Sequence, residues 1–305
     1  SVPYVGIHSK AWERFKGKYF PASNDTAVFD PRYPDVREYL IQTYENAVKE
    51  WDLDGFKLDF IDQFSQPAKE NPNAPEGRDY VSTAQAVDRL MTDILSRLKA
   101  LKPDIGIEFR QSYIGPLMRK YGNMFRAADC ANDTVANKIR TIDIRLLSGN
   151  SPAHSDMLTW SPKEIPEAVA LQLINTLFSV QQISVRPSNL PESQKKTLSF
   201  WLSFWEEHRD TLLSGKLRAY QPELLYTIVS AEDEGCYIAA AYAGHTVLPA
   251  PEGTPRKCIY VNGGGWNGVT VCHKTSGKYR LTAKNCMGET LWSETQELQA
   301  QTVSY

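Results

Sequence analysis

Short apolar segments alternate with amphipathic helical segments between residues 34 and 208, and this order limits the folds that the chain can adopt. Residues 34–50 place apolar side chains every three or four positions, as one face of a helix does, and lead directly into a strand-like segment at 51–60. A second helix face follows at 87–101 and ends before Pro103. Alternation of this kind predicts parallel strands wrapped by helices.

The alternation continues beyond residue 101. Expected strands cover residues 105–109, 124–128, 153–157 and 182–185, and expected helices cover 135–147, 162–178 and 191–208. Apolar runs such as 55–56 and 105–107 have polar residues only at their ends, which suits strands buried on both faces. A closed barrel and an open doubly wound sheet both satisfy these observations.

Charged and polar side chains gather at or just past the C-terminal ends of the expected strands. They are Lys57, Asp59, Glu108, Arg110, Asp129, His154, Asp156 and Arg186. In a (β/α)8 barrel all these strand ends converge on one mouth. A nucleotide-binding open sheet would offer a glycine-rich first turn, and the sequence contains neither G-x-G-x-x-G nor a Walker A motif. We therefore expect an α/β protein with a (β/α)8 TIM barrel.

The barrel predicted from this chain is incomplete. Five βα units are recognisable, with a remnant of another at residues 4–7, whereas a barrel needs eight strands. An open barrel would expose strand edges, which favour aggregation. We therefore expect that N-terminal strands of the barrel are missing from this chain, which would be a fragment of a longer protein.

From about residue 213 the helical periodicity stops. Short strand-like runs follow at 224–230, 236–242, 257–261, 269–272 and 279–282, and they are separated by turn residues such as those at 262–265. This pattern predicts a small antiparallel β-sandwich. The expected domains are an incomplete catalytic barrel at 1–212 and a C-terminal β-sandwich at 213–305.

The composition argues against several classes of partner. The chain has 305 residues, 42% of them hydrophobic, and a formal net charge of −2 with acidic and basic residues interspersed. No basic footprint for nucleic acid or for an anionic membrane stands out, and no apolar run approaches the roughly 18 residues of a membrane span. We expect a soluble protein of the bacterial cytoplasm or periplasm, with homo-oligomerisation left open.

The five cysteines are widely spaced, which favours scattered thiols over disulfides.

Two carboxylates at the expected barrel mouth suggest glycoside hydrolysis, in which one attacks the anomeric carbon and the other protonates the leaving oxygen. Asp59 is the candidate nucleophile, because Lys57 lies two residues earlier on the same strand and therefore on the same face. Lys57 can keep Asp59 ionised and can donate hydrogen bonds to sugar hydroxyls. A strand-end ion pair without a catalytic role is the alternative.

Asp129 is the candidate acid/base. It follows an apolar strand, and Asn132 or Asp133 is better placed to cap the helix that begins near Thr134. That leaves Asp129 available for chemistry, with a structural carboxylate as the alternative. Competing acids at other strand ends are Glu108, Asp62 and Asp156.

Three motifs in this order resemble glycoside hydrolase family 36, the melibiase-type α-galactosidases. The sequence DGFKLDFI at 54–61 resembles their nucleophile strand, in which a lysine precedes the nucleophilic aspartate by two residues. The sequence FRQS at 109–112, together with the stretch up to Asp129, is similar to the acid/base region that they share with the family 31 α-glucosidases. The sequence AHSDMLTW at 153–160 is similar to the next strand end in the same superfamily.

The resemblance covers most of residues 30–210 and implies a retaining, exo-acting α-glycosidase, most simply an α-galactosidase. It implies Asp59 as the nucleophile and Asp129 as the acid/base, acting on an oligosaccharide or glycoside without a cofactor. Lys57 and Arg110 would bind hydroxyls of the reacting sugar. The chain departs from the family at 128–130, where Ala-Asp-Cys replaces the common Ser-Asp-Asn, and at 110–113, where Arg-Gln-Ser-Tyr replaces a glycine-rich cysteine segment.

Other candidate residues are fewer. The histidines show no H-x-x-x-H or H-E-x-x-H spacing, so no metal site is expected. His154 is a candidate sugar contact, with a hydrogen-bonded histidine at a strand end as the alternative. Trp160, just beyond a strand end, is the best candidate for stacking on a sugar face. Trp51, Trp201 and Trp205 lie on helical core stripes and are expected to pack.

Several alternatives stay open from the sequence. A related α-glucosidase or α-N-acetylgalactosaminidase would use the same residues on another sugar. A non-catalytic carbohydrate-binding relative would keep the pocket without turnover. An aldolase that uses Lys57 as a Schiff base is disfavoured, because a neighbouring Asp59 should keep that amine protonated.

Overall fold

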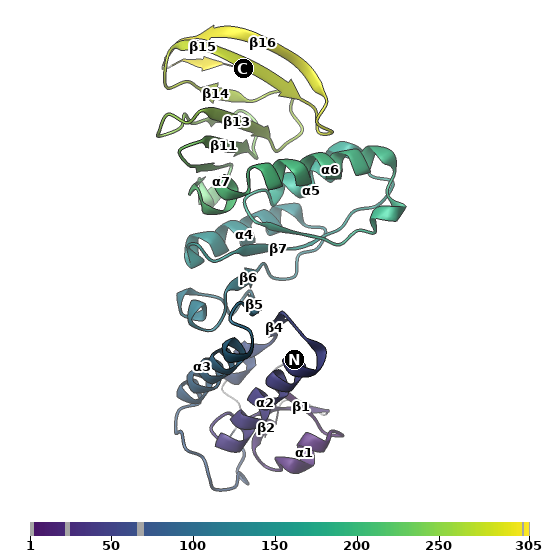
Figure 1. Cartoon of the computed structure of the whole chain (residues 1–305), viewed down its shortest axis with the longest axis vertical. Coiled ribbons are helices and arrows are strands. Elements are labelled where there is room, and N and C mark those ends of the chain that lie inside the picture. The colour runs from purple at the N-terminus through teal and green to yellow at the C-terminus, as the bar shows by residue number, and fades with distance from the viewer. Residues whose placement is uncertain (1–2, 22–24, 66–69, 301, 305) are drawn as a thin grey trace. The chain divides into compact units, whose positions relative to one another are not determined.

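The computed structural model describes residues 3–21, 25–65, 70–300 and 302–304, and the chain forms two compact units, Ser1–Phe125 and Arg126–Tyr305 (Figure 1). The elements of the first unit are β1 (Tyr4–Gly6), α1 (Lys10–Arg14), β2 (Tyr19–Pro21), β3 (Thr26–Phe29), α2 (Pro34–Trp51), β4 (Gly55–Lys57), η1 (Ile61–Ser65), α3 (Thr83–Leu101), β5 (Gly106–Arg110) and η2 (Pro116–Lys120). Strand β6 (Met124–Arg126) carries the chain into the second unit.

A three-stranded sheet in the order β1-β3-β2 lies at the start of the first unit, and both outer strands are antiparallel to β3. The strand expected at residues 4–7 therefore exists, but its assignment to another βα unit is wrong. Phe15, which follows α1, is buried and packs edge-on against Phe29 of β3, with ring centroids 5.7 Å apart. This apolar contact stabilises the small sheet. The sequence shows no helical or strand periodicity here that would predict the sheet.

The βα alternation expected after residue 34 is present. Helix α2 begins at Pro34, a residue suited to a first helical turn, and α2 packs against α3. Strands β4 and β5 pair in parallel, with Gly55 opposite Gly106. A Cβ atom on Gly55 would lie 2.7 Å from the carbonyl oxygen of Gly106, so this close approach of the two backbones requires glycine.

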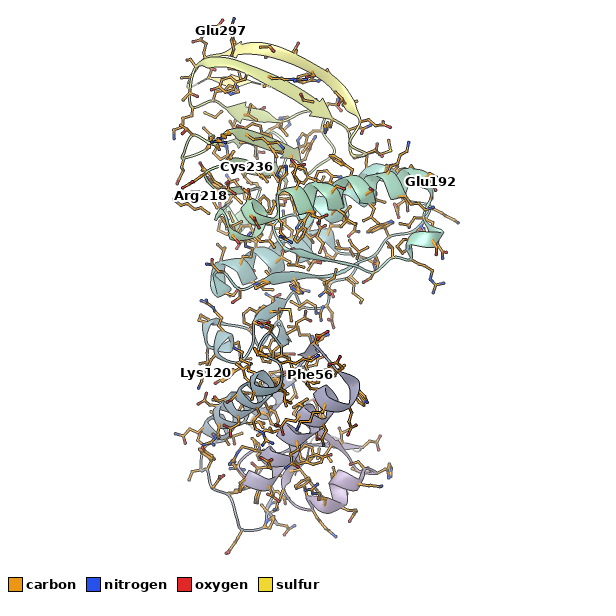
Figure 2. The ribbon with its side chains drawn as sticks, in the orientation of Figure 1. Phe56, Lys120, Glu192, Arg218, Cys236 and Glu297 are labelled. Atoms are coloured by element: carbon orange, nitrogen blue, oxygen red, sulfur yellow. The ribbon has the colours of Figure 1, made fainter. Side chains whose placement is uncertain are left out.

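Polar contacts connect further segments of the first unit to one another. The buried carboxylate of Asp30 accepts hydrogen bonds from Arg32 and Arg78, and Arg32 also donates to Glu70 at 2.9 Å. These bonds tie the segment at 70–80 to the region between β3 and α2. Lys120 of η2, labelled in Figure 2, donates a hydrogen bond to the carboxylate of Asp88 in α3. Because the buried Asp30 and Arg32 have partners of opposite charge, these bonds offset part of their desolvation cost.

The second unit follows β6. Its elements are α4 (Thr134–Ser148), β7 (Ala153–Leu158), α5 (Pro166–Asn175), β8 (Val180–Ile183), η3 (Pro187–Asn189), α6 (Glu192–Glu207), α7 (Arg209–Ser214), β9 (Lys216–Tyr220), η4 (Pro222–Leu224), β10 (Ile228–Glu232), β11 (Cys236–Ala241), β12 (Val247–Leu248), β13 (Lys257–Asn262), β14 (Thr270–Cys272), β15 (Gly277–Lys284), β16 (Thr290–Leu298) and β17 (Val303–Ser304). Strands β7 and β8 are parallel, and the ladder shifts register between His154 and Met157.

The C-terminal strands form several sheets. The prediction that these strands are all antiparallel is wrong. One sheet has the order β13-β11-β10-β9, and β11 and β13 pair in parallel. A smaller sheet has the order β12-β14-β17, in which β12 and β14 are parallel, and β15 and β16 form a separate hairpin. The parallel pairs arise because the chain leaves β11 and β12 through long connections rather than hairpin turns, a route that local turn residues do not reveal.

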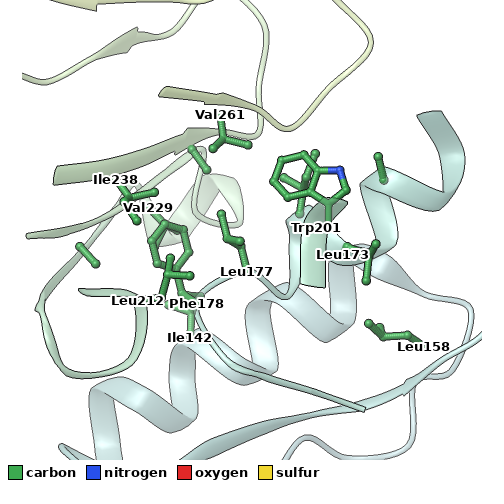
Figure 3. Close-up of a cluster of buried hydrophobic side chains, with 14 of the residues drawn as sticks. Ile142, Leu158, Leu173, Leu177, Phe178, Trp201, Leu212, Val229, Ile238 and Val261 are labelled. Atoms are coloured by element: carbon green, nitrogen blue, oxygen red, sulfur yellow. The ribbon is translucent and has the colours of Figure 1, made fainter. Parts of the chain in front are cut away.

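The sheet β13-β11-β10-β9 is covered on both faces. On β11, Ile238 and Ala240 face the apolar residues of α4, α5, α6 and α7, whereas Tyr237 and Ala239 face β12 and β14. This follows from the two-residue period of a strand. Figure 3 shows the first of these cores, with Trp201 of α6 beside Val261 of β13. The helices and the sheet of the second unit thus share one hydrophobic core.

Two of the three tryptophans expected to pack do so. Trp201 is buried in this core, and the indole N–H of Trp205 donates to the carbonyl oxygen of Ser179 at 2.9 Å. Trp51 is 70% exposed, so its assignment to the core is wrong. It is the last residue of α2, where the left-handed Asp52 ends the helix beyond its packed stripe. No helix in the described part of the chain is long and apolar enough to cross a bilayer.

Truncation of Ile238 tests the shared core. We expect Ile238→Ala to lower the free energy of unfolding by about 2–5 kcal/mol, because a fully buried side chain leaves a cavity between helices and sheet. The same substitution at Ile165, which is 62% exposed, should change it by less than about 0.5 kcal/mol. Urea unfolding followed by tryptophan fluorescence measures both, and equal losses would contradict the two-sided packing of β11.

Candidate active site

The carboxylate of Asp59 lies just beyond β4 and is held mainly through one of its two oxygens. Its Oδ1 accepts hydrogen bonds from Arg110 Nε at 2.6 Å, from the Tyr113 hydroxyl at 3.0 Å and from the backbone N–H of Phe60 at 3.0 Å. Its Oδ2 faces Lys57, with Nζ 3.9 Å away. The two oxygens of Asp59 therefore have different surroundings.

The local backbone explains how Asp59 reaches this position. The N–H of Leu58 still donates to the carbonyl oxygen of Glu108, so the parallel ladder extends one residue past β4 and buries Leu58. Phe60 then adopts a left-handed conformation with φ of 63°, which is uncommon for a residue with a side chain and turns the chain away from the strand. The guanidinium of Arg110 lies 5.1 Å from the centre of the Phe60 ring.

Opposing effects act on the charge of Asp59. Burial by itself would raise the pKa of the carboxyl group, but the hydrogen bonds from Arg110 and Tyr113 and the charges of Arg110 and Lys57 together hold its pKa below the usual value. Burial, and next the neighbouring Asp59, raise the pKa of the Tyr113 hydroxyl, which therefore stays protonated as a donor. Asp59 is thus a carboxylate at neutral pH.

A second group of charges lies in the second unit. Arg126, at the end of β6, donates to Asp129 Oδ1 at 3.0 Å and also to the buried carboxylate of Asp156 on β7. The Asp129 side chain is 78% exposed. As predicted, a residue other than Asp129 caps α4: Asp133 accepts the hydrogen bond from the N–H of Ala136.

The other two predicted residues of the second unit have different surroundings. His154 of β7 is half-buried, and its Nδ1 lies 3.4 Å from Nε2 of Gln182 on β8. Trp160 packs against the apolar core of the second unit, and its indole N–H donates to the buried Gln194 of α6 at 3.2 Å. The edge of Trp160 is thereby fixed by α6.

A cavity of about 280 Å3 lies beside β4 in the first unit. Its lining includes Lys57 and Phe56 of β4, and aromatic side chains that come from β1, β3 and α2, namely Tyr4, Phe29, Tyr39 and Tyr44. Lys57 therefore borders both this cavity and the Asp59 carboxylate. No group of three or more His, Cys, Asp or Glu side chains in the described residues is arranged to hold a metal ion.

The structure brings together three of the predicted residues, Lys57, Asp59 and Arg110, in the first unit. Sequence reasoning missed Tyr113, because it lies in an irregular segment after β5 where no periodicity or motif marks it. It also missed the role of Arg126, which donates to a near neighbour in the sequence and to an acid 30 residues away on the next strand.

Comparisons with known proteins identify solved structures with a similar fold. No protein-family model and no curated protein matches the chain. Among solved structures, the family 36 α-galactosidase AgaA from Geobacillus stearothermophilus aligns with a TM-score of 0.56 at 14% identity, over 75% of this chain and 33% of its own. A variant of AgaA in complex with stachyose gives 0.58 at 15% identity over the same shares. The α-galactosidase from Lactobacillus brevis gives 0.56 at 13% identity, over 92% of this chain and 38% of its own.

The expected resemblance to family 36 is therefore confirmed at the level of the fold. The chain spans about a third of the length of the enzymes that it matches, with 33% of AgaA and 38% of the Lactobacillus brevis enzyme covered. At these identities the likeness defines architecture, and the chemistry has to be argued from the side chains of this chain.

Removal of the Tyr113 hydroxyl tests the environment of Asp59. We expect Tyr113→Phe to raise the pKa of the Asp59 carboxyl group, because the ionised form loses a hydrogen-bond donor. Carbon-13 NMR of the aspartate carboxyl groups measures the titration, with the signal assigned by Asp59→Asn. Tyr121→Phe is the matched control, since that hydroxyl bonds to Asp88 instead. An unchanged titration in Tyr113→Phe would show that this hydrogen bond is not formed in solution.

Proposed function

We propose that the chain carries the catalytic residues of a retaining, exo-acting α-glycoside hydrolase, of the α-galactosidase type. The observation that supports this best is the asymmetric environment of Asp59: three donors fix Oδ1, whereas Oδ2 is left for attack beside Lys57. An ionised, oriented carboxylate at a strand end is what a glycosidase nucleophile requires. The fold-level likeness to family 36 α-galactosidases agrees with it.

The proposed reaction proceeds in two displacements. Oδ2 of Asp59 attacks the anomeric carbon while the bond to the leaving oxygen breaks, and Asp129 gives its proton to that oxygen. Asp129, now ionised, then takes a proton from water, which attacks the anomeric carbon and releases Asp59. Retention requires the two carboxyl groups to stand about 5–5.5 Å apart in the assembled enzyme. The reaction needs no cofactor.

Sugar binding would use the cations and aromatic groups near these acids. Lys57 and Arg110 present N–H donors beside Asp59, and His154 is a further candidate from the second unit. Trp160 is a weaker candidate for stacking, because its indole is engaged by Gln194 and by the core. Since a variant of AgaA is described in complex with stachyose, we propose an oligosaccharide with a terminal α-galactosyl residue as substrate. An α-glucoside or an α-N-acetylgalactosaminide is the alternative.

We also propose that strands β4 to β8 and their helices belong to one (β/α)8 barrel, with the domain at 1–212 and the β-sandwich at 213–305. The parallel pairs β4–β5 and β7–β8 and the intervening helices support this. A barrel would also place the ends of β4 and β6, and thus Asp59 and Asp129, at a common mouth.

Hydrolysis of aryl α-glycosides tests the function. The longest natural chain that contains this sequence would be assayed on a panel of these substrates, with the first anomer released identified by NMR. We expect rapid release of α-galactose, and a loss of at least about 1,000-fold in kcat/KM for Asp59→Asn, because the neutral amide cannot form the glycosyl ester.

Asp62→Asn provides a matched control, since it removes a nearby carboxylate that the proposal does not use. Release of the β anomer first would contradict retention. Sugar binding without turnover by the unsubstituted chain would contradict catalysis and would favour a carbohydrate-binding relative. Activity in Asp59→Asn equal to that of the unsubstituted chain would remove Asp59 from its proposed role.

A further inference from the structure

Asp156 occupies an irregular position in β7. The β7–β8 ladder shifts register between His154 and Met157, and an amide side chain from α4 bonds to the Asp156 backbone there. The N–H of Asp156 donates to Asn137 Oδ1 at 3.0 Å, and Asn137 Nδ2 donates to the Asp156 carbonyl oxygen at 3.3 Å. Both residues are buried. Irregularities of this kind often re-aim a side chain, and in β7 the adjacent residues Ser155 and Asp156 are both buried.

The buried carboxylate of Asp156 organises the turn that carries Asp129. One oxygen accepts a hydrogen bond from Arg126, and the other accepts one from the backbone N–H of Cys130 at 2.5 Å. Arg126 uses its second terminal nitrogen to reach Asp129 Oδ1 at 3.0 Å. Asp156 therefore contacts the group that holds the Asp129 side chain and also the backbone immediately after it.

The positive charge of Arg126 beside Asp129 has to be balanced by Asp156 if Asp129 is to act as a proton donor. Arg126 alone would favour the ionised form of Asp129 and hinder it as a proton donor. Asp156 neutralises Arg126, so that the three groups together carry one negative charge when both acids are ionised. From α4, Arg140 donates to the carbonyl oxygen of Asp129 at 2.9 Å, and Asp133 caps the first turn. These two groups have opposite charges.

We propose that Asp156 is a positioning residue for the acid/base: it fixes the turn at 128–130 and balances the charge of Arg126, so that Asp129 can alternate between its protonated and ionised forms. This rests on the proposed function, in which Asp129 is the acid/base. Asp156 itself is 1% exposed, so its carboxylate is not accessible to a substrate from solvent. Its effect is transmitted through Arg126 and the Cys130 backbone.

Asp156→Asn tests the proposal, because it keeps the shape of the side chain and removes its charge. We expect the alkaline limb of the kcat/KM profile for a poor leaving group, such as an α-galactosyl disaccharide, to move to lower pH by about one unit. At neutral pH, kcat/KM for the disaccharide should fall at least about tenfold. For 2,4-dinitrophenyl α-galactoside, whose departure needs no proton, kcat/KM should change by less than about threefold. A merely structural role would lower both alike.

Arg126→Met combined with Asp156→Asn is the second variant, and it removes both charges, which a core often tolerates better than an unpaired charge. Its alkaline limb should lie at or above that of the unsubstituted chain. Circular dichroism and urea unfolding establish that each variant is folded. If Asp156→Asn does not fold, an alkaline limb in the double variant that lies below that of the unsubstituted chain overturns the proposal.

Asp129→Asn separates failure of this inference from failure of the proposed function. If Asp129→Asn leaves disaccharide hydrolysis intact, the acid/base assignment is wrong and the role of Asp156 is overturned with it. If Asp129→Asn abolishes hydrolysis but Asp156→Asn leaves the alkaline limb and the dependence on leaving group unchanged, only the role of Asp156 is overturned.

Discussion

Carboxylates that are buried or half-buried beside parallel strands of this protein have to be neutralised by a neighbouring charge. Leaving a charge unpaired at the edge of a packed sheet costs several kcal/mol. The chain meets this constraint twice in a similar way. Asp59 after β4 is paired with Arg110 at the end of β5, and Asp156 of β7 is paired with Arg126 at the end of β6. An acid from one strand and an arginine from another thus form the frame of each group.

Elements defined by local rules could be predicted from the sequence. Proline starts α2, Asp133 caps α4 as one of the two residues expected to do so, and the placement of Lys57 two residues before Asp59 puts both on one face. Features set by distant contacts could not. Tyr113 lies in an irregular segment, and the parallel pairing of β11 with β13 depends on a long connection whose turn residues do not specify the direction of the next strand. The exposure of Trp51 depends on where α2 stops packing, which its helical period does not record.

The second unit shows why a change of secondary structure need not mark an independent domain. Helices give way to strands after α7, yet the two regions bury their apolar side chains in one core. Further contacts cross the same line: Lys138 of α4 donates to the carbonyl oxygen of Tyr226 at 3.3 Å and lies 4.4 Å from the centre of the Tyr242 ring. Burial lowers the pKa of Lys138 to about 8. The proposed domain boundary between residues 212 and 213 therefore separates helices and strands that stabilise each other.

The three donors on Asp59 Oδ1 have a consequence for the second half of the proposed reaction. Donors that withdraw charge from a carboxylate make it a weaker attacking group, and they also make it a better departing one. In a glycosyl ester formed through Oδ2, Oδ1 is the carbonyl oxygen, and Arg110, Tyr113 and the Phe60 N–H remain in place to receive the negative charge that returns when water displaces the sugar. In the proposed reaction, this geometry of Asp59 would slow the formation of the ester and would shorten the lifetime of the ester once formed.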